Sequence, residues 1–88
     1  MKPEVYILIC SNSRYYIGST GDLKRRLEEH KKGKTKATRH IRPVRLVFHQ
    51  EFKSLIKARR AEQKLKNFKS AKILKKIIKD GMIKFVDE

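Results

Sequence analysis

Acidic residues are scarce in this 88-residue chain. Nine Asp and Glu stand against 24 Lys and Arg, which gives a formal net charge of +15. Such an excess of one sign costs stability through self-repulsion unless an anionic partner relieves it. Nucleic acid is the partner that we predict, because binding to phosphates releases their counterions. A surface that is merely lysine-rich and an acidic membrane surface are the alternatives.

Tryptophan and long apolar runs are also missing. A basic helix that binds membranes usually carries Trp or Phe on its apolar face, and here the basic residues are spread along the whole chain. No stretch approaches the length of a membrane span, and no signal peptide opens the sequence. We therefore predict no membrane partner and a reducing, cytoplasmic setting, with association with the nucleoid as a further option.

Cysteine occurs once, as Cys10. One cysteine excludes an internal disulfide and a cysteine-rich zinc site, and its apolar surroundings predict a buried, inert thiol. His30, His40 and His49 lack the spacing of zinc ligands. A Walker-type phosphate loop and a dinucleotide fingerprint are absent as well.

The apolar residues that are present follow regular periods, which argues against disorder. At this length the chain has room for one domain, covering residues 1–88. Strands are predicted over residues 5–10, 15–19 and 44–52. Helices are predicted to begin after Thr20 or Asp22, after Ser54 and after Ser70, and to end at Gly33, near Phe68 and at Gly81. Residues 82–88 fit either a short strand or packing on the surface.

The order β-β-α-β-α-α predicts an α/β (α+β sandwich-like) fold, in which a small three-stranded sheet is flanked by helices. Strict alternation in the third strand predicts two faces. One face would carry Val44, Leu46, Phe48 and Gln50, and the other Arg45, Val47, His49 and Glu51. A core stripe on the second helix would consist of Leu55, Ala58, Ala61, Leu65 and Phe68.

Three short segments carry a recognisable motif: residues 4–8 (EVYIL), 16–20 (YIGST) and 23–30 (LKRRLEEH). Together they resemble the GIY-YIG nuclease superfamily, especially its small single-domain bacterial members, in which YVYIL, YIGST and LxRRLxxH recur. The resemblance extends from Val5 to about Phe68. It implies a metal-dependent endonuclease that hydrolyses DNA phosphodiester bonds with low sequence specificity, on targets defined by structure such as branched, flapped or single-stranded DNA.

The resemblance also implies a catalytic set, consisting of Tyr6, Tyr16, Arg26, His30 and Glu62. Tyr16 corresponds to the family's proposed general base, and Tyr6 would line the same pocket. Arg26 would contact the scissile phosphate through its guanidinium group. His30 lies one turn further along the helix and could orient the nucleophile or share in proton transfer. Whether Tyr16 or His30 takes the proton stays open.

Glu62 is the candidate metal ligand, because residues 58–66 (ARRAEQKLK) resemble the family's helix that carries an essential glutamate. Mg²⁺ keeps most of its water, so one carboxylate and a substrate phosphate could hold one Mg²⁺ or Mn²⁺ ion. The alternative is a surface ion pair between Glu62 and Lys66, four residues apart. The scarcity of acids, and the bases on both sides of Glu62, favour the metal ligand.

The basic segment from Lys31 to Arg42 is expected to grip the nucleic-acid backbone, which positions a substrate without reading its sequence. A flexible, solvated loop is the alternative. The predicted nucleic-acid-binding residues are Lys24, Arg25, Lys31, Lys32, Lys34, Lys36, Arg39 and Arg42.

Two positions depart from the family pattern. Glu4 replaces the first glycine of the GIY motif, and Ser19 stands where the nuclease subunit of bacterial excision repair carries lysine. Gly18 and Ser19 are predicted to be structural parts of the motif, and the loss of the lysine could make activity slow or limited to particular substrates. The alternative function is a catalytically weak or inactive nucleic-acid-binding protein with the same fold. RNA as a substrate and the oligomeric state stay open.

Overall fold

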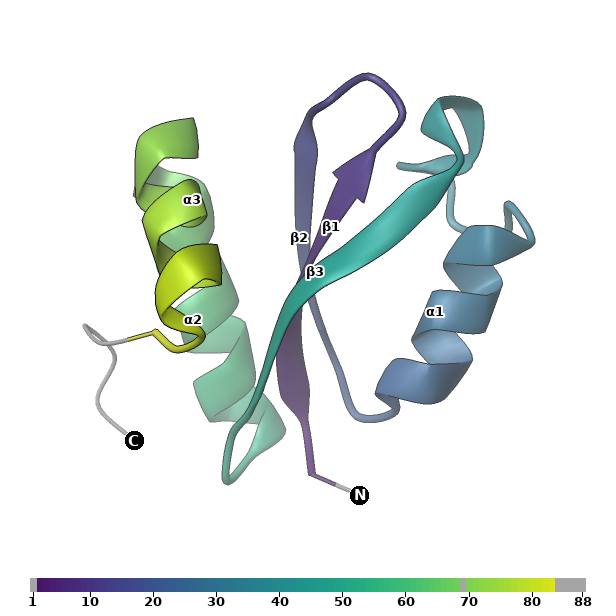
Figure 1. Ribbon diagram of the computed structural model, residues 1–88. Helices are drawn as coiled ribbons and strands as arrows, with labels where there is room; N and C mark the ends of the chain where they lie inside the picture. Colours follow the sequence, from purple (N-terminus) through teal and green to yellow (C-terminus); the bar gives the residue numbers. More distant parts are fainter. Residues whose placement is uncertain (1, 69, 84–88) are drawn as a thin grey trace.

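The computed structural model describes residues 2–68 and 70–83 (Figure 1). Its elements are β1 (Glu4–Cys10), β2 (Tyr15–Thr20), α1 (Leu23–Lys31), the 3-10 helix η1 (Arg39–Ile41), β3 (Val44–Glu51), α2 (Leu55–Phe68) and α3 (Ala71–Asp80). The order β-β-α-β-α-α confirms the fold prediction. Of the C-terminal segment, Ile83 is buried, and residues 84–88 lie outside the described residues.

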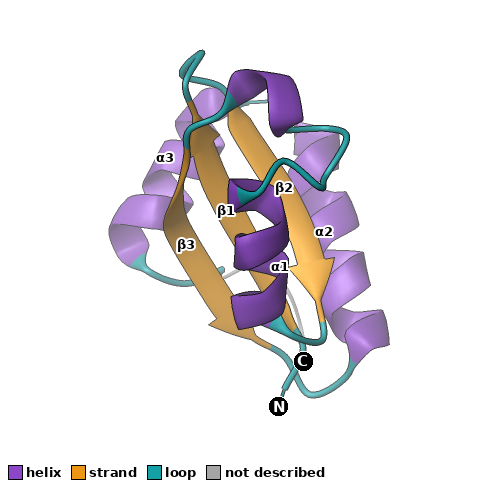
Figure 2. Cartoon of the chain, turned by 90° about the vertical axis from the view of Figure 1, so that its right-hand side faces the viewer, coloured by secondary structure: helices purple, strands orange, loops and turns teal. Residues whose placement is uncertain are grey.

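The sheet is antiparallel throughout, with the order β2-β1-β3, so that β1 is central and β2 and β3 are its edges. Helix α1 covers one face of the sheet, and α2 and α3 cover the other (Figures 1 and 2). The edge strand β2 therefore has a helical layer over each of its two faces.

The main hydrophobic core lies between the sheet and the α2–α3 layer. It consists of Val5, Ile7, Ile17, Phe48, Phe52, Ala58, Ala61, Leu65, Leu74, Ile77 and Ile83. Leu55 and Phe68, the predicted ends of the α2 stripe, are exposed instead, and the buried part of the stripe is Ala58, Ala61 and Leu65. On the α1 side the packing is different in kind, since the one fully buried residue of α1 is His30.

The predicted alternation of β3 is wrong in its first half. A bulge shifts the register between Ile7, which pairs with Phe48, and Leu8, which pairs with Leu46. An extra residue in one strand reverses the faces on either side of it. Leu46 therefore packs beside Leu27 under α1, whereas Val47 and Phe48 pack on the core under α2 and α3.

The helix ends agree with the sequence. Asp22 caps α1 by accepting from the Arg25 N–H, Ser54 accepts from the Lys57 N–H, and Ser70 caps α3. Gly33 and Gly81 follow α1 and α3 with positive φ, where a side chain would be strained. No helix among the described residues is both long and apolar enough to span a membrane.

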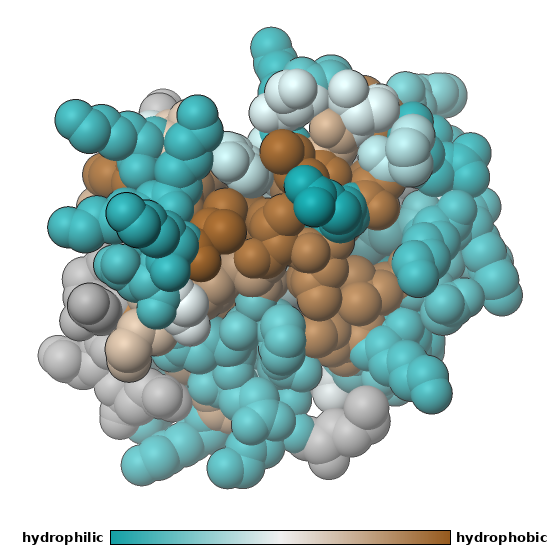
Figure 3. Space-filling view, viewed as in Figure 1, coloured by the Kyte–Doolittle hydropathy of each residue, from teal (hydrophilic) through white to brown (hydrophobic). Residues whose placement is uncertain are grey.

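Hydrophilic side chains gather over α1 and α3, and a band of apolar surface lies between them over β3 (Figure 3). Cys10 is buried as predicted, and burial raises the pKa of its thiol.

Candidate active site

Tyr6 and Gly18 lie against each other on the α1 face of the sheet. Tyr6 lies on β1 directly opposite Gly18 on β2. A Cβ atom at Gly18 would lie 2.6 Å from both Cζ and Oη of Tyr6, well inside van der Waals contact. The glycine of the YIG segment therefore allows the Tyr6 ring to approach β2 this closely.

A chain of polar groups begins at this phenol. The Arg26 Nε–H donates to Tyr6 Oη at 3.4 Å, and Tyr6 Oη lies 3.0 Å from His30 Nε2. On the other side of the imidazole, His30 Nδ1 lies 2.8 Å from Thr38 Oγ1. Tyr6, His30 and Thr38 have 0% exposure. Arg26 and His30 meet Tyr6 because a spacing of four residues puts both on one helix face.

Tyr16 completes the group from the edge strand. Its ring centroid lies 5.1 Å from that of His30, edge to face, and 6.3 Å from that of Tyr6. Unlike Tyr6 and His30, Tyr16 is only half-buried. It is therefore the aromatic member of the group that solvent, or a substrate, can reach.

Burial and neighbouring charges set the protonation states of the group. Burial raises the pKa of Tyr6 to about 12, with Tyr16 and Glu62 adding to the rise and Arg26 opposing it. Burial also lowers the pKa of His30, and the Arg26 charge lowers it further. The hydrogen bond to Tyr6 raises the pKa of Arg26. Near neutral pH the group holds a neutral phenol and a guanidinium cation, and a neutral imidazole is favoured.

Glu62 approaches β2 from the opposite face. The Ser19 hydroxyl donates to Glu62 Oε1, and Lys66 Nζ lies 2.5 Å from Oε2. Consecutive strand residues face opposite sides, so Gly18 adjoins Tyr6 while Ser19 adjoins Glu62. The carboxylate is partly buried, with 19% of its side chain exposed. The ion pair with Lys66, which was the alternative interpretation of Glu62, is therefore present, and the metal-ligand interpretation stays a prediction.

A divalent ion at Glu62 would have to rely on this one protein carboxylate. Among residues 2–68 and 70–83 no three His, Cys, Asp or Glu side chains are grouped to hold a metal. Mg²⁺ accepts one protein carboxylate if water and phosphate supply the other ligands. An ion at Glu62 would compete with Lys66 for Oε2.

The basic segment between α1 and β3 makes several internal hydrogen bonds. Thr38 and Ile41 anchor it through backbone bonds, Thr38 N–H to Thr35 O at 3.2 Å and Ile41 N–H to Thr38 O at 3.0 Å. Arg42 lies over Gly33 and donates to Lys31 O at 3.1 Å and Arg39 O at 3.0 Å. Arg42, predicted to bind nucleic acid, therefore also holds the loop together.

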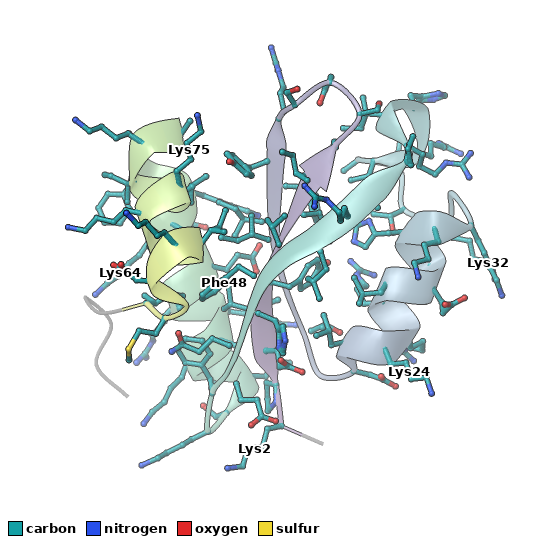
Figure 4. The ribbon with its side chains drawn as sticks, in the orientation of Figure 1. Lys2, Lys24, Lys32, Phe48, Lys64 and Lys75 are labelled. Atoms are coloured by element: carbon teal, nitrogen blue, oxygen red, sulfur yellow. The ribbon has the colours of Figure 1, made fainter. Side chains whose placement is uncertain are left out.

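The predicted nucleic-acid-binding side chains are exposed. Figure 4 shows Lys24 and Lys32 on the α1 layer and Lys64 and Lys75 on the opposite layer. The residues of the predicted set are Lys24, Arg25, Lys31, Lys32, Lys34, Lys36, Arg39 and Arg42. All belong to α1 or the loop that follows it, on the side of the sheet that holds Tyr6 and His30.

An open groove of about 620 Å³ lies beside Tyr16, between β2 and the start of α3. Its walls are largely apolar, and Arg14 and Lys66 are the basic residues that line it. The groove therefore adjoins Tyr16 and Lys66, the residue that pairs with Glu62.

Two contacts of the site were not predicted from the sequence. Thr38 was one residue of a basic loop without periodicity, so nothing indicated that its side chain is buried against His30. The bond between Ser19 and Glu62 depends on how α2 packs against β2, and the local sequence does not record that packing. The departure of Ser19 from the lysine of the excision-repair nuclease subunit drew attention to this position, but it did not indicate a bond to Glu62.

Comparisons with known proteins point in a single direction. A protein-family model described as the GIY-YIG catalytic domain matches residues 2–76. A UPF0213 protein of Streptococcus pneumoniae is 45% identical over 69 residues, which cover 77% of this chain and 70% of that protein. A UPF0213 protein of Staphylococcus haemolyticus is 38% identical over 77 residues, covering 86% of this chain and 94% of that protein. The solution NMR structure of a UPF0213 protein from Bacillus halodurans matches with a TM-score of 0.59 and 36% identity, over 92% of this chain and 87% of that one.

Proposed function

The chain belongs to the GIY-YIG family, a nuclease family, and from that premise we propose that it is a metal-dependent endonuclease that hydrolyses DNA phosphodiester bonds with low sequence specificity. The observation that carries the proposal is the gathering of Tyr6, Tyr16, Arg26 and His30 on one face of the sheet. Burying polar groups in so small a core costs stability. A site that performs chemistry accounts for that cost.

Hydrolysis of a phosphodiester needs three things: an activated water, stabilisation of negative charge, and help for the leaving oxygen. In this proposal Arg26 supplies part of the second. Its side chain is 39% exposed while its Nε is tied to Tyr6, so its remaining N–H groups can turn to a phosphate. Glu29, which holds Nη1 at 3.2 Å, would be exchanged for the substrate.

The proton of the attacking water would pass to Tyr16 or to His30. Tyr16 is favoured by access, because it is half-buried at the sheet edge whereas His30 has no exposed surface. A phenol has an ordinary pKa of about 10, and acting as a base near neutral pH requires a cation beside it. The bound metal and Arg26 are the cations that this proposal offers.

Glu62 would hold the metal, one Mg²⁺ or Mn²⁺ ion. GIY-YIG nucleases are generally metal-dependent, and the bound ion supplies Lewis-acid stabilisation of the phosphate. The Ser19 hydroxyl would keep Oε1 oriented, and Lys66 would turn from Oε2 to a neighbouring phosphate. Ser19 would thus have a different role from the lysine that the nuclease subunit of bacterial excision repair carries at this position.

The substrate would be recognised by charge and shape. The exposed cations of α1 and of its following loop would follow a phosphate backbone, which does not specify sequence. Branched, flapped or single-stranded DNA, structures that arise in DNA repair, are the targets we expect, and the cytoplasm, including the nucleoid, is the expected location. Catalysis on RNA is an outcome that the same assay can detect.

A second candidate is a nucleic-acid-binding protein with the same fold and little catalysis. The Glu62–Lys66 ion pair favours it, because this pair occupies the oxygen that a metal would need. The cluster of Tyr16, Arg26 and His30 around the Tyr6 phenol opposes it, because nucleic-acid binding alone does not require such a cluster.

The deciding experiment is cleavage of labelled duplex, single-stranded, flapped and four-way-junction DNA, and matching RNA, with Mg²⁺ or Mn²⁺. The wild type is compared with Glu62→Ala, Tyr16→Phe and the control Glu51→Ala, which removes an exposed carboxylate from β3. Metal-dependent cutting that the first two variants lose and the control keeps supports the nuclease. Binding without cutting under every metal would favour the binding protein.

A further inference from the structure

Thr38 is a buried polar residue in the most basic loop of the molecule. Its neighbours Ala37 and Arg39 are exposed, yet its own side chain has 0% exposure. A buried hydroxyl costs free energy unless it is hydrogen-bonded. The partner of Thr38 Oγ1 is His30 Nδ1 at 2.8 Å, so the loop folds inward in order to reach the imidazole.

The donors and acceptors in the hydrogen-bonded series from Arg26 to Thr38 indicate which atoms carry protons. Arg26 Nε can only donate, so Tyr6 Oη accepts from it. The phenol keeps its own proton, and the acceptor in reach is His30 Nε2 at 3.0 Å. Nε2 must then be unprotonated. A neutral imidazole carries its one proton on the other nitrogen, so Nδ1–H donates to Thr38 Oγ1.

Two other arrangements are possible and both are worse. With the proton on Nε2, Thr38 would donate to Nδ1, Tyr6 Oη would receive two donors, and the phenol proton would lie buried without an acceptor among the described residues. In the Nδ1–H arrangement the proton left without such an acceptor is that of the Thr38 hydroxyl, which is a weaker donor than a phenol. An imidazolium would place a fully buried cation near Arg26, the positive charge that already faces it from α1. The other charged or titratable groups facing the ring are Glu29 from α1, Tyr6 from β1 and Tyr16 from β2.

We propose that Thr38 is a positioning residue that holds His30 as the Nδ1–H tautomer, so that Nε2 fixes the Tyr6 hydroxyl beside Arg26. The inference rests on the proposed nuclease function where it concerns catalysis. With both ring nitrogens engaged inside the protein, His30 does not take the proton from water, and that role falls to Tyr16. Thr38 itself touches no substrate and acts through His30.

The first test measures the tautomer directly, without DNA or metal. Ring ¹⁵N chemical shifts distinguish Nδ1–H, Nε2–H and imidazolium, and the variants His40→Gln and His49→Gln assign the His30 signals. The expected result near neutral pH is one dominant Nδ1–H form. A dominant Nε2–H form or an imidazolium would overturn the proposal, whether or not the protein cuts DNA.

The second test removes the acceptor. Thr38→Val keeps the size of the side chain, Thr38→Ser keeps the hydroxyl, and Thr35→Val makes the same exchange three residues earlier in the same loop. We expect Thr38→Val to mix the tautomers and to lower kcat about 10–100-fold with little change in KM, by analogy with the loss of the hydrogen-bond partner that orients a metal-ligating histidine. Thr38→Ser should restore both readouts, and Thr35→Val should alter neither.

The outcomes separate the two proposals. If Thr38→Val keeps a pure Nδ1–H signal and wild-type kcat, Thr38 does not position His30. If Thr38→Val fails to fold, the wild-type spectrum and Thr38→Ser still decide. If no DNA or RNA is cut by the wild type while the tautomer is as expected, the nuclease function fails and the assignment of the proton stands.

Discussion

At the scale of single residues, the contact between Gly18 and Tyr6 sets the geometry of the site. A methyl group at Gly18 would lie 2.6 Å from the end of the Tyr6 ring. We expect Gly18→Ala to displace the phenol from His30 and Arg26 and to destabilise the fold by about 1–3 kcal/mol, the usual cost of overpacking. Urea unfolding and the cleavage assay measure the two effects.

The matched control for that substitution is Gly21→Ala. Gly21 is exposed, and a Cβ atom there would meet nothing within 4 Å. Its stability and activity should stay near those of the wild type. Equal losses from Gly18→Ala and Gly21→Ala would show that the contact with Tyr6 is not the cause.

His30 should make stability depend on pH. Burial and the Arg26 charge lower its pKa below the ordinary 6.5, so the unfolded chain binds the proton first as pH falls. Stability is therefore fully present above about pH 6.5 and is lost as pH falls through the lower folded value, by at most about 1.4 kcal/mol per pH unit for one proton. The measurement is urea unfolding at several pH values. His30→Gln should flatten this slope, and His40→Gln, at an exposed histidine, should leave it unchanged.

The residues of the site differ in how far their positions could be predicted from the local sequence. Tyr6 and Tyr16 were predictable because β1 and β2 form a hairpin, and the hairpin register puts Tyr6 against Gly18. Arg26 and His30 were predictable because helical spacing gives them one face. Thr38 depends on the path of an aperiodic loop, and no local pattern encodes that path. Whether these residues perform the proposed roles stays a prediction.

At the scale of elements, periodicity and capping residues predicted the strands and helices. In β3 they did not predict which face each side chain occupies. Alternation predicts faces only while one residue opposes one residue, and the bulge at Val47 breaks this count. Both neighbouring apolar residues can still be buried, because each face of the sheet has a helical layer. A sequence with apolar residues on both faces therefore gives no warning of the bulge.

The loop between α1 and β3 allows the two roles of its arginines to be separated. Arg42 donates to Lys31 O and Arg39 O, whereas no hydrogen bond of the Arg39 side chain is recorded among the described residues. Arg42→Ala should cost about 1 kcal/mol per hydrogen bond lost and speed amide exchange at Thr38 and Ile41. Arg39→Ala removes the same charge and should leave exchange unchanged. Equal exchange in both variants would contradict the structural role of Arg42.

At the scale of the whole molecule, the positive charge is larger than one binding face can use. The formal net charge of +15 is distributed over both helical layers, and only α1 and its loop lie on the side of Tyr6 and His30. Lysines on α3 lie on the far side of the sheet from that group. If the proposed site is correct, equal charges on the two layers should contribute unequally to binding.

Two triple variants with the same loss of three positive charges test this difference. One replaces Lys32, Lys34 and Lys36 of the loop by Gln, and the other replaces Lys72, Lys75 and Lys79 of α3. Each phosphate contact contributes about 0.7–0.9 to the slope of log K against log salt, so losing three should lower the slope by roughly 2–3. We expect that fall for the loop variant, measured by titration of labelled DNA at several salt concentrations. The α3 variant should keep nearly the wild-type slope, because general attraction to a distant charge is screened beyond about 10 Å at 0.1 M salt. Equal slopes for the two variants would mean that DNA does not follow the α1 face, and the proposed substrate path would have to be abandoned.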